Sequence, residues 1–286
     1  MHFAALASRR PIFRSLAVMA ITPFLALNAC GISSSSATTT LTSTVAGGKS
    51  ATITTENGKI EVIKDPAVTG VQISAEIRCY GKDQAEADAR LKATTLVADS
   101  DANGEVAISV NAPKRAGGSW INMNSDVMNI TVRAADLSGI VATTSNGSIT
   151  IGAFAGNARL ETSNGRITVE GHKGPIDALT SNGSIDITGA SAAKAETSNG
   201  RITVSLADDA TGDLVLKTSN GSVTLDLPEA WQGTVSAETS LGSVNLSGGT
   251  VAGKGESKTM KVGDASKATA TIETSLGSVT VRQAKK

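Results

Sequence analysis

The side chains best suited to bind a charged ligand are two arginines with an aspartate between them along the chain. Arg166 and Arg201 each follow a glycine, and Asp186 lies in the intervening segment of a repeated pattern. Two guanidinium groups can bind an anionic group, because arginine donates paired hydrogen bonds to carboxylate or phosphate oxygens. The alternative is an exposed ion-pair cluster, which would contribute little to stability.

Catalytic chemistry has few candidates in this sequence. Beyond residue 29 there is one histidine, His172, and the only cysteines are Cys30 and Cys79. One histidine and one free thiol cannot form a zinc site, and a serine–histidine–acid triad would need His172 as its base. His172 lies between two glycines, so we expect a solvated turn residue and no catalytic residue, metal or cofactor. We expect Cys79 to be a buried thiol, with a reactive thiol as the alternative.

A polysaccharide-cleaving enzyme would need several acids on one face. Asp186, Glu161 and Glu196 are the acids that would have to meet, and the enzyme hypothesis fails if they lie far apart with no cleft between them. The chain beyond residue 29 has about three more acidic than basic residues, so the sequence gives no reason to expect nucleic acid.

A short phrase, Thr-Ser-Asn-Gly followed by alternating apolar residues, defines the elements that carry these side chains. Apolar residues recur at every second position before and after the phrase, which predicts strands with one buried face. Two short strands and two turns cannot bury an apolar face alone, but stacked coils can. The phrase begins at Thr144, Thr162, Thr180, Thr197 and Thr218, returns as Thr-Ser-Leu-Gly at Thr239 and Thr274, and has an earlier relative at Thr55.

We therefore predict an all-β protein, a single-stranded parallel β-helix or β-solenoid with coils of about 17–21 residues. A run of β-hairpins with Asn-Gly turns is the alternative, but Gly152, Gly171 and Gly189 indicate a second corner in each coil. Asn-Gly tolerates positive φ at the first corner. Stacking would align the corner asparagines in a hydrogen-bonded structural ladder of Asn146, Asn164, Asn182, Asn199 and Asn220.

Two features interrupt the array. Residues 247–269 form a Gly-, Ser- and Lys-rich insertion, expected to be a loop with or without a short strand. Leu241 and Leu276 replace the corner asparagine, and we expect them to pack beneath this insertion; a small apolar contact patch is the alternative. Before the array, Asp83 and Glu86 predict a helix start, and this helix should run to about Leu96.

The N-terminal residues predict export. Arg9, Arg10 and Arg14 precede an apolar run that is too short to predict a membrane span. Leu27-Asn28-Ala29-Cys30-Gly31 resembles the lipobox of bacterial lipoproteins, which implies cleavage before Cys30, acylation of that cysteine and a membrane attachment. Gly31 in place of aspartate implies the outer membrane by the same resemblance. A plain secretory signal or an uncleaved anchor is the alternative, and Sec and twin-arginine export both stay open.

These signals divide the chain into four parts: a signal peptide at 1–29, a flexible Ser/Thr-rich tether at 30–44, an N-terminal coil with a strand–helix–strand cap at 45–135, and the solenoid repeats at 136–286. From the early coil through the serial Thr-Ser-x-Gly-x-Ile-x-Val coils, residues 45–285 resemble the bacterial putative-adhesin family with the DUF4097-type β-helical domain. The resemblance implies a β-helical fold and a cell-envelope location.

We therefore expect a non-catalytic, lipid-anchored envelope protein that acts as an adhesin or a binding scaffold. The alternatives are a structural or signalling module of the envelope that binds a protein partner, and an enzyme acting on envelope polysaccharide. The partner would be a protein or a glycan, at a surface that includes Arg166, Asp186, Arg201, Leu241 or Leu276.

Overall fold

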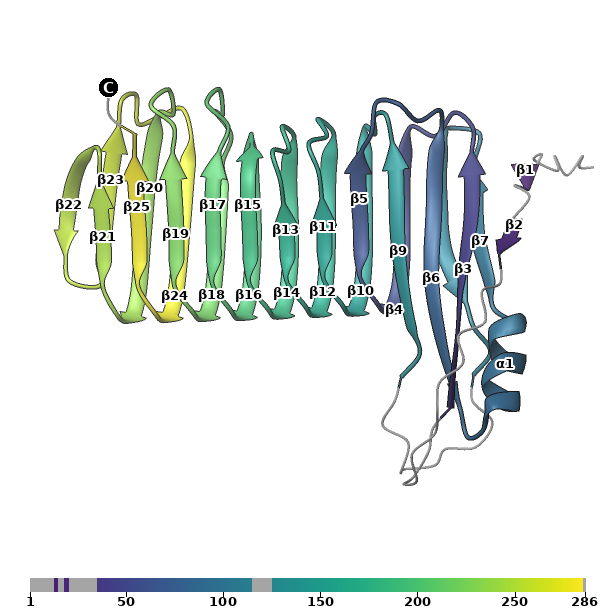
Figure 1. Cartoon of the computed structure of the whole chain (residues 1–286). Helices are drawn as coiled ribbons and strands as arrows, with labels where there is room; N and C mark the ends of the chain where they lie inside the picture. The colour runs from purple at the N-terminus through teal and green to yellow at the C-terminus, as the bar shows by residue number, and fades with distance from the viewer. Residues whose placement is uncertain (1–12, 15–17, 21–34, 115–124, 285–286) are drawn as a thin grey trace, which may run out of the picture.

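The computed structural model describes residues 13–14, 18–20, 35–114 and 125–284, and they form the predicted β-solenoid. Two sheets face each other, and successive coils lie side by side along one axis (Figure 1). In each coil one strand lies in sheet 1, the chain turns at the Asn-Gly corner, and the next strand lies in sheet 2. Neighbouring coils pair in parallel and in register, as Ile149, Ile167 and Ile185 show.

Sheet 1 has thirteen strands among the described residues and sheet 2 has twelve. In spatial order, the strands of sheet 1 are β1 (Phe13–Arg14), β7 (Thr95–Ser100), β8 (Glu105–Asn111), β4 (Ser50–Asn57), β10 (Gly139–Asn146), β12 (Asn157–Asn164), β14 (Pro175–Asn182), β16 (Ala192–Asn199), β18 (Leu214–Asn220), β24 (Thr269–Leu276), β20 (Gly233–Leu241), β23 (Ser257–Val262) and β22 (Thr250–Lys254). Those of sheet 2 are β2 (Val18–Ala20), β3 (Ser35–Val45), β6 (Val71–Gly81), β9 (Val127–Ala134), β5 (Ile60–Lys64), β11 (Ile149–Ile151), β13 (Ile167–Val169), β15 (Ile185–Ala190), β17 (Ile202–Leu206), β19 (Val223–Leu227), β25 (Val279–Gln283) and β21 (Val244–Ser247).

The core lies between the two sheets and repeats from coil to coil. Inward residues such as Ala142, Ile149 and Ile151 are completely buried, while the residues between them face solvent. Burying a side chain of this size contributes roughly 1.5–3 kcal/mol. A single coil lacks the neighbours that exclude water from these side chains, so this stabilisation depends on stacking.

The predicted tether is wrong for residues 35–44, because Ser35–Val45 forms β3, which pairs antiparallel with β6 along its whole length. Every second residue of β3 is buried, including Leu41 and Val45. The small polar residues Thr39 and Ser43 occupy inward positions of the same alternation. Residues 31–34 alone separate β3 from Cys30, and the predicted lipidation site itself lies outside the described residues.

Helix α1 (Gln84–Lys92) packs against β6 and β3 at the N-terminal end of the stack (Figure 1). Asp83 caps it by accepting a hydrogen bond from the Glu86 main-chain nitrogen at 2.8 Å. The helix ends at Lys92 rather than near Leu96, since Thr95–Ser100 enters sheet 1 as β7. No helix among the described residues is long and apolar enough to cross a membrane.

The last coil does not follow the chain order of the array. β24 and β25 lie between the coil of β18 and β19 and the coil of β20 and β21 (Figure 1). Residues 228–232 join β19 to β20 and carry the chain past this layer. The expected insertion loop is instead largely a hairpin of β22 and β23, and β23 pairs antiparallel with β20 at the end of sheet 1.

Candidate functional site

The structure places Arg166, Asp186 and Arg201 on the outer face of sheet 2. Arg166 Nε lies 3.8 Å from Asp186 Oδ2, and the two side chains are 65% and 41% exposed. Asp186 lies level with Thr168 and Thr203 of the neighbouring coils. No ion pair joins Asp186 to Arg201 among the described residues. This geometry is an exposed ion pair beside a second arginine.

The three acids of the enzyme hypothesis do not meet. Asp186 projects from sheet 2, whereas Glu161 and Glu196 project from the outer face of sheet 1, with the apolar core between the two faces. Within the described residues, no three His, Cys, Asp or Glu side chains are grouped so as to hold a metal ion. Cys79 is buried beside Thr94, and burial raises the pKa of its thiol, which disfavours the reactive thiolate.

The corner asparagines form a continuous ladder. Each side-chain amide donates to the Oδ1 of the asparagine in the preceding coil, for example Asn164 to Asn146 at 2.9 Å. Leu276 and then Leu241 take the next two positions of the row. The bonds run from Asn146 to Asn57, Asn164 to Asn146, Asn182 to Asn164, Asn199 to Asn182, and Asn220 to Asn199.

The reason for the corner glycine differs from the expected one. No non-glycine residue in the described part of the chain has positive φ, so the asparagines do not need that conformation. A Cβ on Gly183 would instead overlap the carbonyl oxygen of Gly165 in the preceding coil, and the other corner glycines make the same close approach. Glycine is therefore required by the spacing between layers.

The threonine of the phrase completes this stacking. Thr180 is buried, and its Oγ1 donates to the carbonyl oxygen of Gly165 at 3.1 Å. Thr162 and Thr197 make the same bond to Gly147 and Gly183, each at 3.0 Å. The phrase is scaffold chemistry, because its threonine, asparagine and glycine all bind the adjacent coil.

Leu241 and Leu276 are 64% and 49% exposed, so the expectation that they pack beneath the insertion is wrong. The hairpin pairs with residues Gly233–Glu238 of β20, which end before the corner and leave Leu241 uncovered. These two leucines lie side by side as an exposed apolar pair.

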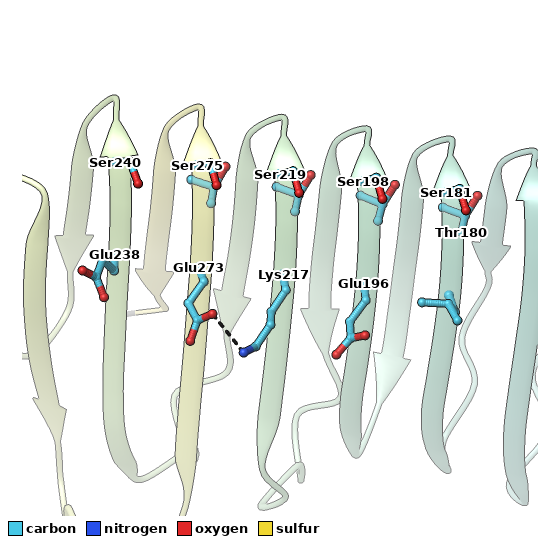
Figure 2. Close-up of a pocket in the computed structure, with 14 residues that line it drawn as sticks. Thr180, Ser181, Glu196, Ser198, Lys217, Ser219, Glu238, Ser240, Glu273 and Ser275 are labelled. Carbon is cyan, nitrogen blue, oxygen red and sulfur yellow. Dashed lines mark ion pairs between the residues drawn. The ribbon is translucent and has the colours of Figure 1, made fainter.

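A shallow groove of about 540 Å³ crosses the outer face of sheet 1 over its distal coils. Figure 2 shows two rows that line it: serine hydroxyls near the corner and charged side chains further along the strands. The serine row contains Ser181, Ser198, Ser219, Ser275 and Ser240, and the charged row contains Glu196, Lys217, Glu273 and Glu238.

Three carboxylates and one ammonium group give the charged row an acidic character. Lys217 Nζ lies 2.9 Å from Glu273 Oε2, and this contact raises the pKa of Lys217. The row combines hydroxyl and carboxylate groups, which can form hydrogen bonds to a polar ligand. The neighbours of Glu273 depend on the inserted last coil, because β24 lies between β18 and β20.

Two further side chains, those of His172 and Trp231, are buried. His172 is buried rather than solvated, with Nε2 2.7 Å from the carbonyl oxygen of Gly156. Burial lowers the pKa of His172, because an imidazolium would lose its hydration there. Trp231 is completely buried in the corner formed by residues 228–232, where it covers the core.

Comparisons with known proteins identify the fold. The family model of Toastrack DUF4097 matches residues 90–282, and no curated protein matches the chain. Among solved structures, a putative cell adhesion protein from Clostridium sporogenes is 13% identical, with 88% of this chain and 100% of that chain covered and a TM-score of 0.32. A putative adhesin from Bacteroides fragilis is 13% identical, with 86% and 97% covered and a TM-score of 0.41.

A putative lipid binding protein from Parabacteroides distasonis is 11% identical, with 87% and 97% covered and a TM-score of 0.25. The family match spans well over half of the sequence and includes the coils that carry the asparagine ladder. The chain belongs to the Toastrack DUF4097 family.

Proposed function

We propose that this protein is a non-catalytic, lipid-anchored component of the bacterial cell envelope, which binds a partner as an adhesin or scaffold. The observation that carries the proposal is the outer face of sheet 1, where the groove is broad, shallow and lined by hydroxyl and carboxylate groups. Its serines repeat at the layer spacing of about 4.8 Å. Such a periodic polar surface suits an extended ligand, a glycan chain or an extended polypeptide.

The separation of the acids supports a binding role over glycoside hydrolysis. Hydrolysis needs two carboxyl groups about 5–10 Å apart across one substrate bond. Asp186 lies on the opposite face from Glu161 and Glu196. On sheet 1, Glu273 and Glu238 lie level in adjacent coils, but the groove around them is shallow and would leave a substrate exposed to water.

The binding face is tested by capture from the intact envelope. The full chain with Glu196→Gln, Glu238→Gln and Glu273→Gln should lose the partners that the unchanged chain retains after crosslinking. Asp186→Asn, on the opposite face, is the matched control and should retain them. Equal capture by all three proteins would exclude the sheet 1 face as the binding surface.

The anchor has a separate test. Metabolic labelling with a fatty-acid analogue should mark the unchanged chain and leave Cys30→Ser unmarked. Labelling of both proteins to the same extent would remove Cys30 as the lipidation site. The size of the mature chain, measured by mass spectrometry, distinguishes cleavage before Cys30 from an uncleaved anchor.

A further inference from the structure

The two long edges of the solenoid carry opposite charge. The corner edge consists of the eight Asn-Gly or Leu-Gly corners, from residues 56–59 to residues 240–243 and 275–278. It has three cations, Lys59, Arg166 and Arg201, and one carboxylate, Glu56. The far edge consists of the described loops at the opposite ends of the strands, and these loops hold nine carboxylates and three lysines. They are residues 46–49, 65–70, 101–104, 135–138, 152–156, 170–174, 191, 207–213, 228–232, 248–249 and 263–268.

The cations of the corner edge occupy the first, third and fifth of its eight coils. Lys59, Arg166 and Arg201 directly follow their corner glycines, and serines stand between them. Lys59 pairs with Glu61 at 2.8 Å and Arg166 with Asp186 at 3.8 Å, so each of these carboxylates offsets part of the charge of its cation. Arg201 has no ion pair among the described residues. The edge therefore presents one unpaired and two paired cations beside the uncharged asparagine row.

The chain leading to Cys30 begins on the same side as the corner edge. Leu41 is level with Ala75, Ala75 with Ile130, and Ile130 with Ile60, the first strand residue after a corner. Ser35 is six residues before Leu41 in β3, so the start of β3 lies roughly 20 Å beyond the level of Ile60, on the side of the corners. The five residue steps from Ser35 to Cys30 span at most about 18 Å. A lipid on Cys30 therefore holds this side of the protein close to the bilayer.

The exposed leucines lie at the other end of the same edge. Ten strand spacings separate β3 from β21 in sheet 2, or about 48 Å at the usual spacing. A tilt of roughly 20° then compensates for the extension of β3 below the corner edge. That tilt brings the distal corners, with Leu276 and Leu241, to the bilayer surface (Figure 1).

We propose that the corner edge docks on the anionic phospholipid surface of the membrane in which the Cys30 lipid is inserted. The anionic surface attracts Arg166 and Arg201, Leu276 and Leu241 enter the headgroup region, and the acidic far edge points away. The solenoid then lies along the membrane with the groove of sheet 1 open to a partner. This inference rests on the proposed anchor for the attachment and on the edge itself for the orientation.

The first experiment measures orientation with the intact lipoprotein in vesicles of phosphatidylethanolamine and phosphatidylglycerol. An environment-sensitive fluorophore is attached to Ser275→Cys on the corner edge or to Thr211→Cys on the far edge. The native Cys79 is buried, so the introduced thiol is the one that reacts with the fluorophore. We expect the corner label to be shielded from acrylamide and the far label to be fully quenched. Equal quenching of the two labels would overturn the proposal.

The second experiment uses the full chain with Cys30→Ser, which has no lipid and binds vesicles through the protein surface alone. Its binding to anionic vesicles should weaken with salt. Arg166→Gln with Arg201→Gln should weaken it roughly 30-fold, given the usual contribution of a basic residue near an anionic surface. Lys173→Gln with Lys267→Gln, which removes the same charge from the far edge, is the matched control and should leave it unchanged. Leu241→Ser with Leu276→Ser should also weaken binding, with Val251→Ser as its control.

The outcomes separate the two proposals. Vesicle binding by Cys30→Ser without acylation of the unchanged chain would reject the anchor and retain the docking edge. Acylation with equal quenching of both labels would retain the anchor and reject the docking edge. A third outcome would replace the lipid by a glycan. In it, the Cys30→Ser chain binds a polyanionic glycan but not anionic vesicles, and the double arginine variant no longer binds the glycan.

Discussion

The side-chain amide of Gln283 lies 3.1 Å from the main-chain carbonyl oxygen of Trp231 and also donates to those of Pro228 and Glu229. Gln283 ends the last strand, whereas the three carbonyl groups belong to the corner between β19 and β20. That corner carries the chain past the layer that β24 and β25 occupy. The last strand therefore binds the corner that passes over its own layer.

Gln283→Ala should loosen the last coil. It leaves the three corner carbonyl groups without this donor, at a cost of roughly 1–3 kcal/mol. Hydrogen exchange should become faster in β24 and β25 and remain unchanged in β12 and β14. Gln72→Ala, at an exposed position of β6, is the control. Unaltered exchange in β25 would show that Gln283 does not hold the coil.

Gly183→Ala should strongly destabilise the stack. The new Cβ would overlap the carbonyl oxygen of Gly165, so the layers would have to separate, at a cost of about 3 kcal/mol. Gly152→Ala is the matched control, because the nearest atom to a Cβ there is 3.5 Å away. Urea unfolding should show a lower midpoint for the first variant alone. Equal midpoints would mean that the corner adjusts without cost.

The stacked part of the fold was predictable because every coil repeats the same alternation of apolar residues and the same corner residues. Period-two apolar residues indicated the two sheets, and the corner asparagines indicated the ladder. The position of the last coil was not predictable. The coils of Leu241 and Leu276 have the same corner pattern, so the sequence allows either of them to stack next to the coil of Asn220. The layer order involves the hydrogen bonds of Gln283 to the corner at residues 228–232, which join segments distant in the chain.

Local composition concealed other features. β3 presents Thr39 and Ser43 at inward positions, so its alternation resembles a polar linker until β6 pairs with it. His172 stands between glycines as a turn residue would, but the preceding coil covers it and Gly156 accepts its hydrogen bond. In the candidate site, the outward positions were readable from the sequence, whereas the contact of Lys217 with Glu273 required the inserted coil.

Asp126→Ala should destabilise the N-terminal cap. Asp126 binds Arg90 in an ion pair whose side chains are 9% and 16% exposed for Arg90 and Asp126, and it accepts from the Tyr80 main-chain nitrogen at 2.9 Å. Removing the carboxylate leaves the Arg90 charge buried, at a cost of roughly 3 kcal/mol. Asp136→Ala removes the exposed pair with Lys64 and should cost about 0–1 kcal/mol. Equal unfolding midpoints for the two variants would contradict the assigned role of the buried pair.

His172 should make the stability of the fold depend on pH below neutrality. Burial lowers the pKa of His172 in the folded protein below its value of about 6.5 in the unfolded chain. Between these two pKa values the unfolded chain binds the extra proton, so stability rises with pH in this window and is lost as pH falls through it. Above about pH 6.5 the histidine is neutral in both states and this contribution is complete.

His172→Gln isolates this contribution, because the glutamine amide can donate to Gly156 but does not titrate. Urea midpoints measured from pH 5 to 8 should fall on acidification in the unchanged protein and fall less in the variant. Lys64 also disfavours the imidazolium, so Lys64→Gln should reduce the pH dependence slightly. Identical pH profiles for the unchanged protein and His172→Gln would show that His172 is protonated in the folded stack, and thus that the stack admits water or an acceptor at Nδ1.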